Sequence, residues 1–351
     1  MTRPTIIIKA QALHRLMDEL LGACGCPEDT RAIAAEVFLE AELRGIGLQG
    51  IDYMPYLIAN LRNGNIDPQG RARLVKESEG SALIDGGNGL GQPGAVMAAD
   101  VAVEKAKTVG SASVGVTNSQ DIFMIGYYAE RIARQGCVGM VCTSGPPLVH
   151  AHGGVDRVLS TNPIAFGIPT QNTHPVIVDM ATSALSNARI RQASYHGEQV
   201  PLGTGVGPDG QPTTDAATIR KGAISPMAGH RGFGLSLVVA LLSGPLTGSD
   251  VGPALAGSVS GEPSGSQGHF FFAIDPRSFG ELDTFEAAAT AYINEIQGSK
   301  KAPGVDHIRM PGERAMAERE RRLVEGVPVL TATWDIIGDL ARELNVSMPE
   351  P

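Results

Sequence analysis

Short β-rich segments that alternate with helical ones fill the middle of the chain, and this alternation is the strongest constraint on its fold. The strand-like segments between residues 81 and 275 are rich in β-branched or aromatic side chains and are bounded by Gly, Pro or Asn: ALID, SVGVT, VGMVCT, PIAFGIP, PVIVDMA and HFFFAID. Helical stretches lie between them at residues 94–107 and 122–135. Strands separated by helices in this way predict an α/β unit.

Both ends of the chain have a helical pattern. Near the N-terminus, apolar residues recur at i, i+3, i+4, i+7 and i+8, as Leu13, Leu16, Met17, Leu20 and Leu21. A second helix is predicted from Pro27 to Leu43, and the segments DTFEAAATAYINEI and WDIIGDLAREL near the C-terminus are also helical in period. We therefore predict a helical domain made of residues 1–75 together with 280–351, and a central α/β domain at residues 76–279.

Charge, hydropathy and cysteine spacing exclude several classes of partner. The formal net charge is −9 and there is no basic run, so nucleic acid is not expected as a partner. No stretch is long and apolar enough to span a membrane, and the most apolar one, GLSLVVALLSG at residues 234–244, predicts a buried helix. The spacing of Cys24, Cys26, Cys137 and Cys142 fits no disulfide ladder and predicts reduced thiols in a cytoplasmic protein.

The segment GLGQPG at residues 89–94 has the G-x-G-x-x-G pattern of dinucleotide-binding turns. A Rossmann fold needs an acidic residue at the end of the next strand to hold a ribose. That strand ends with Asn118 and Ser119 instead, and Pro93 stands where the helix should open. A tight turn between strand and helix therefore explains the motif better than a Rossmann fold.

Four polar loops that directly follow predicted strands are stronger signals. They are TNSQD (117–121), TSGPP (143–147), LSTNP (159–163) and DMATS (179–183). Short hydroxyl and amide side chains with free backbone N–H groups suit ribose and phosphate groups. GHRGFG at residues 229–234 opens a helix and adds Arg231 as a candidate phosphate partner. Together these loops indicate a nucleotide cleft.

Histidines are the usual proton carriers near neutral pH, and only His14 precedes position 150. His150 and His152 stand one residue apart beside a glycine pair, where a structural role is the alternative to catalysis. No third ligand has a spacing that fits zinc, so no metal site is expected. The motifs of serine hydrolases, zinc proteases and P-loop kinases are absent from the sequence.

The order and spacing of five segments resemble one known family. STNPIAFGIPT, VDMATS, DGQPTTD, GHRGFGL and HFFFAIDP are similar to motifs of the malate/L-lactate dehydrogenase family, typified by ureidoglycolate, sulfolactate and Δ1-piperideine-2-carboxylate reductases. The resemblance runs nearly from end to end. It implies a non-Rossmann α/β (α+β) fold like that of sulfolactate dehydrogenase, with a helical domain from both chain ends and a central mixed-sheet domain. It also implies NADH or NADPH as cofactor, a small-molecule substrate and a homodimer.

The same resemblance assigns residues to the lining of the cofactor and active-site cleft. These are Asn118, Ser119, Thr161, Asn162, Asp179, Ser183, His230 and Arg231. Arg231 stands where the family commonly has Lys.

The segment LRGIGLQGIDYMPYL at residues 43–57 departs from the family pattern R-G-x-x-S-H-G-x-x-R-x-P-x-x-Y. Leu48, Gln49 and Tyr53 stand at the family positions of Ser, His and Arg, and Asp121 replaces a second His. Gln cannot shuttle a proton near neutral pH, and Tyr cannot give a carboxylate the charged bidentate pairing that Arg gives. The resulting catalytic candidates are Gln49, Tyr53, Asp121 and His152, with His150 as a further proton donor to consider.

We therefore predict an oxidoreductase with an altered active site that transfers hydride to or from a small carbonyl or imine compound. Reduction of a preformed iminium needs no proton donor, which agrees with glutamine at position 49. The alternative is a catalytically impaired family member that binds a nucleotide or another ligand. A protein without any nucleotide site is the third hypothesis.

Overall fold

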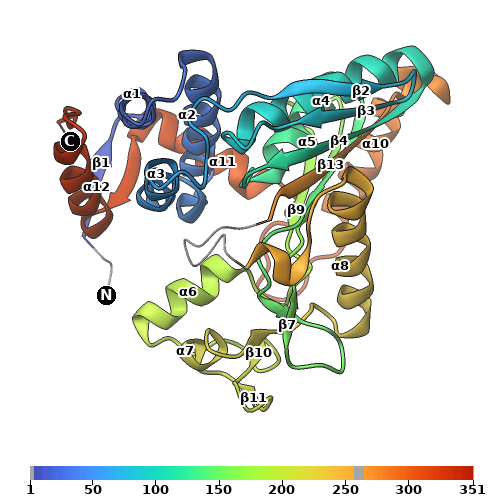
Figure 1. The fold of residues 1–351 in the computed structure, drawn as a ribbon. Coiled ribbons are helices and arrows are strands. Elements are labelled where there is room, and N and C mark those ends of the chain that lie inside the picture. Colours follow the sequence, from blue (N-terminus) through green and yellow to red (C-terminus); the bar gives the residue numbers. More distant parts are fainter. Residues whose placement is uncertain (1–3, 257–264, 351) are drawn as a thin grey trace.

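A seven-stranded mixed sheet forms the centre of the chain in a computed structural model that describes residues 4–256 and 265–350 (Figure 1). Its strands, in order across the sheet, are β2 (Arg73–Glu77), β3 (Ser81–Asp85), β4 (Ser111–Ser119), β13 (Gln267–Ile274), β5 (Val138–Thr143), β8 (Ile164–Ile168) and β9 (Val176–Met180). Strands β3 and β4 are parallel, and every other neighbouring pair is antiparallel. This mixed sheet confirms the prediction of a non-Rossmann α/β fold.

Helices cover both faces of this sheet because successive strand residues point to opposite sides. Helices α4 (Gly91–Val109) and α5 (Ile125–Ala133) pack in an alanine-rich cluster that includes Phe271 of β13. The adjacent Phe270 packs on the other side with Val239 of α8 (His230–Ser243). The core is therefore split into two layers by the sheet.

Helix α8 is less buried than its sequence predicted. Its inner residues Val239 and Ala240 are buried, but Leu237, Val238 and Leu241 are 42–50% exposed. A helix lying on a sheet covers it with one face, and here the other face is also apolar. Neither α8 nor any other helix in the described part of the chain is long and apolar enough to cross a membrane.

The two chain ends meet in a helical group beside the sheet (Figure 1). Its elements are β1 (Thr5–Ile8), α1 (Ala10–Ala23), α2 (Glu28–Leu43), α3 (Met54–Arg62), α11 (Glu313–Glu325), β14 (Val327–Leu330) and α12 (Thr331–Glu343). Strand β1 pairs with β14 in antiparallel register. One hydrophobic cluster joins residues of both ends, including Phe38, Leu57 and Ile337. The predicted apolar stripe of the first helix is fully confirmed, since all five of its residues are buried.

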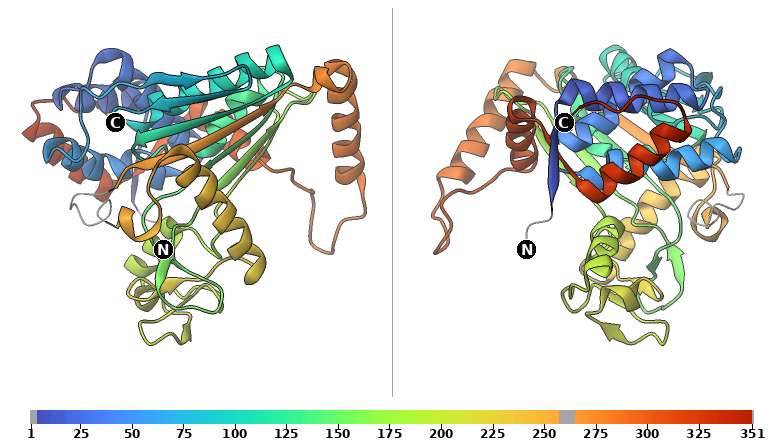
Figure 2. Two further views of the ribbon diagram at one scale, coloured as in Figure 1. Left: turned by 45° about the vertical axis from the view of Figure 1, so that its right-hand side comes forward. Right: turned by 90° about the vertical axis from the view of Figure 1, so that its left-hand side faces the viewer.

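Helix α10 (Leu282–Gly298) lies apart from this group, although it falls within the range 280–351 that was predicted to join it. Figure 2 shows that α10 stands at the opposite end of the sheet and is followed by an extended return segment. Ile293 is its one buried residue, and Tyr292 is 64% exposed. The helix has the expected periodicity, but within the described chain it has little surface to pack on.

A smaller sheet lies below the main one (Figure 1) and carries the remaining elements. Its strands, in order, are β11 (Pro212–Thr213), β10 (Gly205–Val206), β12 (Ala223–Ile224), β6 (Val149–His150) and β7 (Arg157–Leu159). Helices α6 (Asn187–His196) and α7 (Ala216–Ile219) pack on it through a cluster that contains Ile190 and Ile219. Short 3-10 turns complete the fold: η1 (Gly47–Gln49), η2 (Ile51–Tyr53), η3 (Pro245–Thr247), η4 (Gly252–Leu255) and η5 (Pro276–Ser278).

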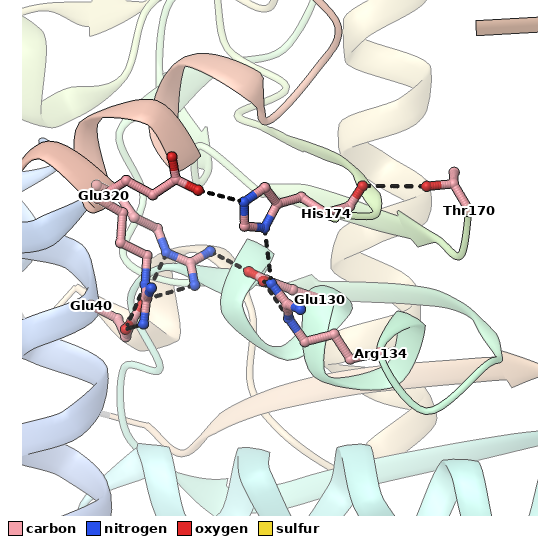
Figure 3. Close-up of polar contacts among 8 residues, drawn as sticks. Glu40, Glu130, Arg134, Thr170, His174 and Glu320 are labelled. Carbon is pink, nitrogen blue, oxygen red and sulfur yellow. Dashed lines mark hydrogen bonds and ion pairs between the residues drawn. The ribbon is translucent and has the colours of Figure 1, made fainter. Parts of the chain in front are cut away.

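A buried charge cluster fastens the helical group to the sheet layer (Figure 3). Arg44, at the end of α2, donates to Glu130 of α5 at 2.6 Å and to Glu40 at 2.8 Å. Arg319 of α11 also donates to Glu40, and Arg134 donates to Glu130. Burial alone would raise the pKa of Glu40, but hydrogen bonds and charges from the two arginines outweigh it and lower the pKa. The cluster therefore ties Arg44, at the end of α2 and just before the segment with Gln49, to helix α5.

Candidate active site

A cavity of about 920 Å³ lies between the helical group, the C-terminal end of β4 and helix α6. Its volume is within the range of small-molecule and cofactor sites. Of the predicted site residues, Gln49, Tyr53, Asn118, Asp121 and Thr161 line it. The fold therefore brings together residues that are up to about a hundred positions apart in the sequence.

Glu42 supports the cavity wall that carries Gln49 and Tyr53. Its buried carboxylate accepts the backbone N–H of Ile51 at 2.8 Å, between the turns η1 and η2. A Cβ atom at Gly50 would collide with this carboxylate, so the turn needs glycine at that position. Burial raises the pKa of Glu42 to about 8. Glycine at position 50 thus lets the backbone pass close to the buried Glu42 side chain.

Tyr53 and Asp121 lie close together at this wall. The Tyr53 ring packs against Phe123 and Tyr56, with ring centroids 4.4 Å and 4.9 Å apart. Asp121 accepts the backbone N–H of Phe123 at 2.9 Å. Burial raises the pKa of Asp121, and burial together with the Asp121 charge raises the pKa of Tyr53. The shift of Asp121 favours the protonated form that a proton donor needs, whereas the shift of Tyr53 keeps the phenol neutral and makes it a weaker acid.

Three residues with left-handed backbone line the cavity. Asn88, Asn118 and Phe123 have φ values of 51°, 50° and 59°. Asparagine tolerates this conformation, whereas a bulky residue such as Phe adopts it at a cost of about 1–3 kcal/mol. The hydrogen bond from Phe123 N–H to Asp121 holds the strained position. Such strain concentrates at functional sites in proteins.

The GLGQPG segment forms a tight turn from β3 into α4, as predicted, and α4 begins at Gly91. A Cβ atom at Gly91 would collide with the carbonyl oxygens of Gln120 and Asp121. The first turn of α4 therefore packs directly against the end of β4. This contact places Gly91 and Gln92 in the cavity lining.

The polar lining of the cavity fits a nicotinamide nucleotide. It is rich in amide side chains, namely Gln49, Asn60, Asn65, Asn88, Gln92, Asn118, Gln120, Asn187 and Gln267. Gln92 is buried and donates to the Asp121 carbonyl at 3.4 Å, while its own Oε1 has no hydrogen-bond partner among the described residues. An unpaired buried acceptor calls for an N–H donor, which a carboxamide provides. Residues such as Gln92, Asn118 and Thr161 would hold the cofactor here.

Three residues predicted for cofactor binding are buried and lie outside the cavity lining. Asn162 is fully buried, accepts from Ser144 at 2.9 Å and donates to Ser236 at 3.0 Å. The Ser119 hydroxyl lies 3.1 Å from a ring nitrogen of His269. Ser183 donates to the Leu185 carbonyl at 2.8 Å. Direct contact with a cofactor stays a prediction for each.

The remaining predicted residues lie outside the lining. Asp179 accepts the backbone N–H of Gly126 at 2.8 Å, at the start of α5. His152 and His230 face each other with ring centroids 6.0 Å apart, and both are exposed. Arg231 is exposed beside His230 on the first turn of α8. The structure therefore separates these four residues from Tyr53 and Asp121.

His150 also lies outside the lining, and the structure gives it a structural partner. Its Nε2 lies 3.0 Å from the Ser225 hydroxyl and its Nδ1 lies 2.8 Å from the Ala151 carbonyl oxygen. The histidine thus joins β6 to the end of β12. No group of three His, Cys, Asp or Glu side chains in the described part of the chain is arranged to hold a metal ion.

Sequence reasoning missed several residues of the site. The arginines Arg157, Arg191 and Arg220 line the cavity from the smaller sheet and its helices. His269 lies behind the wall, hydrogen-bonded to Thr143 at 2.7 Å, and burial lowers its pKa to about 3. The arginines stand in unremarkable helical and loop segments, and nothing in their local sequence shows that these segments face Tyr53.

Known proteins match the chain along nearly its whole length. The model of the family described as malate/L-lactate dehydrogenase matches residues 8–337. L-sulfolactate dehydrogenase of Methanothermobacter thermautotrophicus is 34% identical over 95% of this chain and 96% of its own length. A Δ1-pyrroline-2-carboxylate/Δ1-piperideine-2-carboxylate reductase of Pseudomonas putida is 31% identical over 93% and 95%. A (2R)-3-sulfolactate dehydrogenase (NADP+) of Chromohalobacter salexigens is 31% identical over 90% and 92%.

Solved structures agree with these sequence matches. The sulfolactate dehydrogenase of Methanocaldococcus jannaschii superposes with a TM-score of 0.90 and 32% identity, covering 98% of each chain. This match confirms the predicted likeness to the sulfolactate dehydrogenase fold. The chain belongs to the malate/L-lactate dehydrogenase family, whose named members here are dehydrogenases and reductases, and it is an oxidoreductase of that family.

Proposed function

We propose that the protein uses NADH or NADPH to transfer hydride to or from a small carbonyl or imine compound, with an active site altered at positions 49 and 53. The observation that carries this proposal is the amide-rich cavity in which Gln49, Tyr53 and Asp121 meet. The names of the relatives support it, since they include hydroxy-acid dehydrogenases, an imine reductase and an NADP+-dependent enzyme.

The residues at the wall can perform a limited set of tasks. A bound nicotinamide supplies or accepts the hydride, and the protein orients the reactants. Gln49 can donate a hydrogen bond to a carbonyl oxygen but has no proton to release near neutral pH. Burial raises the pKa of Asp121, which favours its protonated form and makes it the acid of this wall, and the neighbouring Tyr53 hydroxyl can donate a hydrogen bond.

Cofactor binding gives the first prediction. We expect NADH or NADPH to bind with a dissociation constant in the micromolar range in isothermal titration calorimetry. Thr161→Val should weaken binding by about two- to tenfold, the effect of one lost hydrogen bond. The control is Thr108→Val, because the Thr108 hydroxyl donates within α4 to the Glu104 carbonyl and is not in the cavity lining. Absence of heat and of any thermal shift with both cofactors at millimolar concentration would contradict the proposal.

The proton donor gives the second prediction. With any substrate that is turned over, Asp121→Asn and Tyr53→Phe should each lower kcat by about 10²-fold, since both changes keep shape and remove an acid. Tyr127→Phe is the matched control, because the Tyr127 hydroxyl donates to Glu36 outside the cavity. Rates within about threefold of wild type for both variants, far from the 10²-fold of a lost acid, would favour reduction of an iminium without a protein acid.

The second candidate function is a ligand-binding protein without turnover. Leu48, Gln49 and Tyr53 stand at the positions of the family Ser, His and Arg, and this favours the second candidate. The two functions differ in one measurement. A binding protein gives cofactor heat in calorimetry but no oxidation of NADH with any carbonyl or imine compound.

We also propose that the protein is a cytoplasmic homodimer, as its family resemblance implies. The outer face of α8 is a candidate surface for contact with a partner chain, since Leu237, Val238 and Leu241 are all exposed there. The projecting helix α10, with Tyr292 exposed and Phe279 86% exposed just before it, is a second apolar surface of this kind. Large exposed apolar surfaces mark interaction sites.

A further inference from the structure

The turn that carries Gln49 and Tyr53 depends on a single side-chain acceptor at its middle. Within η1 and η2, the N–H groups of Gln49, Gly50 and Tyr53 each donate to the backbone carbonyl three residues earlier. The N–H of Ile51 lies at the junction of the two turns and donates to Oε1 of Glu42 at 2.8 Å. Ile51 is two residues from both Gln49 and Tyr53, so a shift of this junction moves both cavity residues.

The Glu42 carboxyl lies directly against the backbone of both turns. A Cβ atom at Gly50 would lie 2.2 Å from Oε1, and one at Gly47 would lie 3.2 Å from Oε2. Glu42 is only 3% exposed, and Ile51 is 1% exposed in the cluster that contains Phe38. The contact between the carboxyl and the turn is therefore enclosed by the protein and shielded from water.

Two charged groups act on this carboxyl, and neither forms an ion pair with it. Arg322 of α11 donates through Nη1 to the backbone carbonyl of Glu42 at 2.7 Å and through Nε to Glu318 at 2.6 Å. Asp52 of η2 accepts from the Thr333 hydroxyl of α12. Within residues 4–256 and 265–350, no cationic side chain pairs with the Glu42 carboxylate. An ionised Glu42 would thus be buried without a counter-charge in contact.

Other charged groups packed on α2 have partners away from Glu42. Their ion pairs join other residues of this helix or its end: Asp18 of α1 with Arg31, Arg319 of α11 with Glu40, and Glu130 of α5 with Arg44. The turn η1 has no charged residue. Asp52 and Arg322 are therefore the charges that a change of ionisation at Glu42 meets.

Burial favours the protonated form of Glu42. It raises the pKa of this carboxyl to about 8, and Asp52 adds to the effect, whereas the Ile51 N–H and Arg322 lower the pKa. A solvated glutamate loses its proton at roughly pH 4. Between these two values, opening the turn to solvent lets Glu42 release its proton, so opening becomes easier by up to about tenfold per pH unit as pH rises. The closed turn is thus most stable at low pH and loses this stability as pH rises to that of the buried carboxyl.

We propose that Glu42 is a positioning residue of the active site, whose protonated carboxyl holds the turn with Gln49 and Tyr53 in place and whose ionisation loosens that turn. This inference rests on the proposed function, since it takes the cavity as the site of hydride transfer. Glu42 is not in the cavity lining and acts on it through Ile51. The ordering of this wall is therefore coupled to pH.

Two substitutions separate the proton from the hydrogen bond. Glu42→Gln keeps the shape and the acceptor for Ile51 but cannot ionise, whereas Glu42→Met keeps a similar size and removes the acceptor. Glu36→Gln is the matched control, because Glu36 is exposed on the same helix and accepts from Tyr127 outside the cavity. Hydrogen exchange of the full chain, followed by mass spectrometry at pH 6 and pH 9, measures opening of the turn.

In peptides that cover residues 47–53, the ratio of the wild-type exchange rate to that of Glu42→Gln should rise at least about tenfold from pH 6 to pH 9, because only wild type ionises at position 42. The same ratio should stay within about twofold in peptides from β5, which serve as internal reference, and the ratio of wild type to Glu36→Gln should stay equally constant in all peptides.

Catalysis gives a second readout, with pyruvate and NADH as probes at pH 7. Glu42→Met should lower kcat by about 10- to 100-fold and leave the KM for NADH within about threefold of wild type, since a displaced turn misplaces Gln49 and Tyr53. Glu42→Gln should restore kcat, because it keeps the hydrogen bond to Ile51. Circular dichroism checks that each variant is folded, and the exchange comparison with Glu42→Gln decides if Glu42→Met does not fold.

Three results would overturn the inference. They are a ratio of wild-type to Glu42→Gln exchange that stays constant between pH 6 and pH 9, a rise of that ratio that is equally large in β5, and equal kcat values for wild type and folded Glu42→Met. The second result would show that the whole fold loosens rather than the turn. If neither NADH nor NADPH binds, the proposed function fails, and the exchange comparison still decides whether Glu42 controls the turn.

Discussion

Wild-type protein is expected to reduce pyruvate, oxaloacetate and Δ1-piperideine-2-carboxylate at rates about 10²–10⁴-fold below those of family members with histidine at the position of Gln49, the usual cost of a missing general acid. Gln49 lines the cavity on the rigid turn supported by Glu42, where an amide cannot release a proton. The measurement is NADH oxidation followed by absorbance at saturating substrate. Rapid turnover of any of the three compounds by wild type would show that glutamine at position 49 does not lower the catalytic rate.

Replacing Gln49 with histidine tests the role of this position directly. Gln49→His should raise the rate with pyruvate by at least about 10²-fold, because the side chain already faces the cavity that holds Asp121. Gln171→His serves as control, since Gln171 is exposed and outside the lining. A variant that binds NADH like wild type but gains no rate would place the proton donor elsewhere.

Arg44→Met is expected to lower the free energy of unfolding by about 3 kcal/mol or more, as when one partner of a buried ion pair is removed. The Arg44 side chain is 6% exposed and contacts two carboxylates, so its loss leaves Glu130 buried with one arginine fewer. Urea denaturation followed by circular dichroism measures the change.

The matched control is Arg342→Met, because Arg342 and Asp339 form an ion pair whose side chains are 77% and 76% exposed. Exposed pairs of this kind contribute about 0–1 kcal/mol. If Arg44→Met costs no more than Arg342→Met, the charge cluster does not fasten the helical group to the sheet layer.

Local sequence patterns predicted the individual elements well, because they depend on neighbouring residues alone. The stripe from Leu13 to Leu21 is buried as expected, and the helix predicted from Pro27 to Leu43 is α2 (Glu28–Leu43). The strand segments ALID and VGMVCT lie in β3 and β5. Periodicity of apolar residues is sufficient for such predictions.

Relations between distant segments could not be predicted in the same way. The pattern of α8 is equally apolar all round, so it does not show that one face lies on the sheet while Leu237 and Leu241 are exposed. The periodicity of α10 likewise predicts a helix but does not show against which part of the fold that helix lies. Arg191 and Tyr53 line the same cavity although they are more than a hundred positions apart in the sequence. Resemblance to a family indicated the cleft but not the arginine.

The place of β13 in the main sheet has a consequence for how the chain is made. Strand β13 pairs with β4 on one side and β5 on the other, yet residues 267–274 follow β5 by more than a hundred positions. During synthesis, β4 and β5 therefore leave the ribosome well before the strand that joins them, and each exposes an unpaired edge until then. Pairing over such long loops is slow. The nascent chain thus depends on the late arrival of HFFFAI at the centre of its sheet, and this interval is when it is most open to aggregation or to chaperone binding.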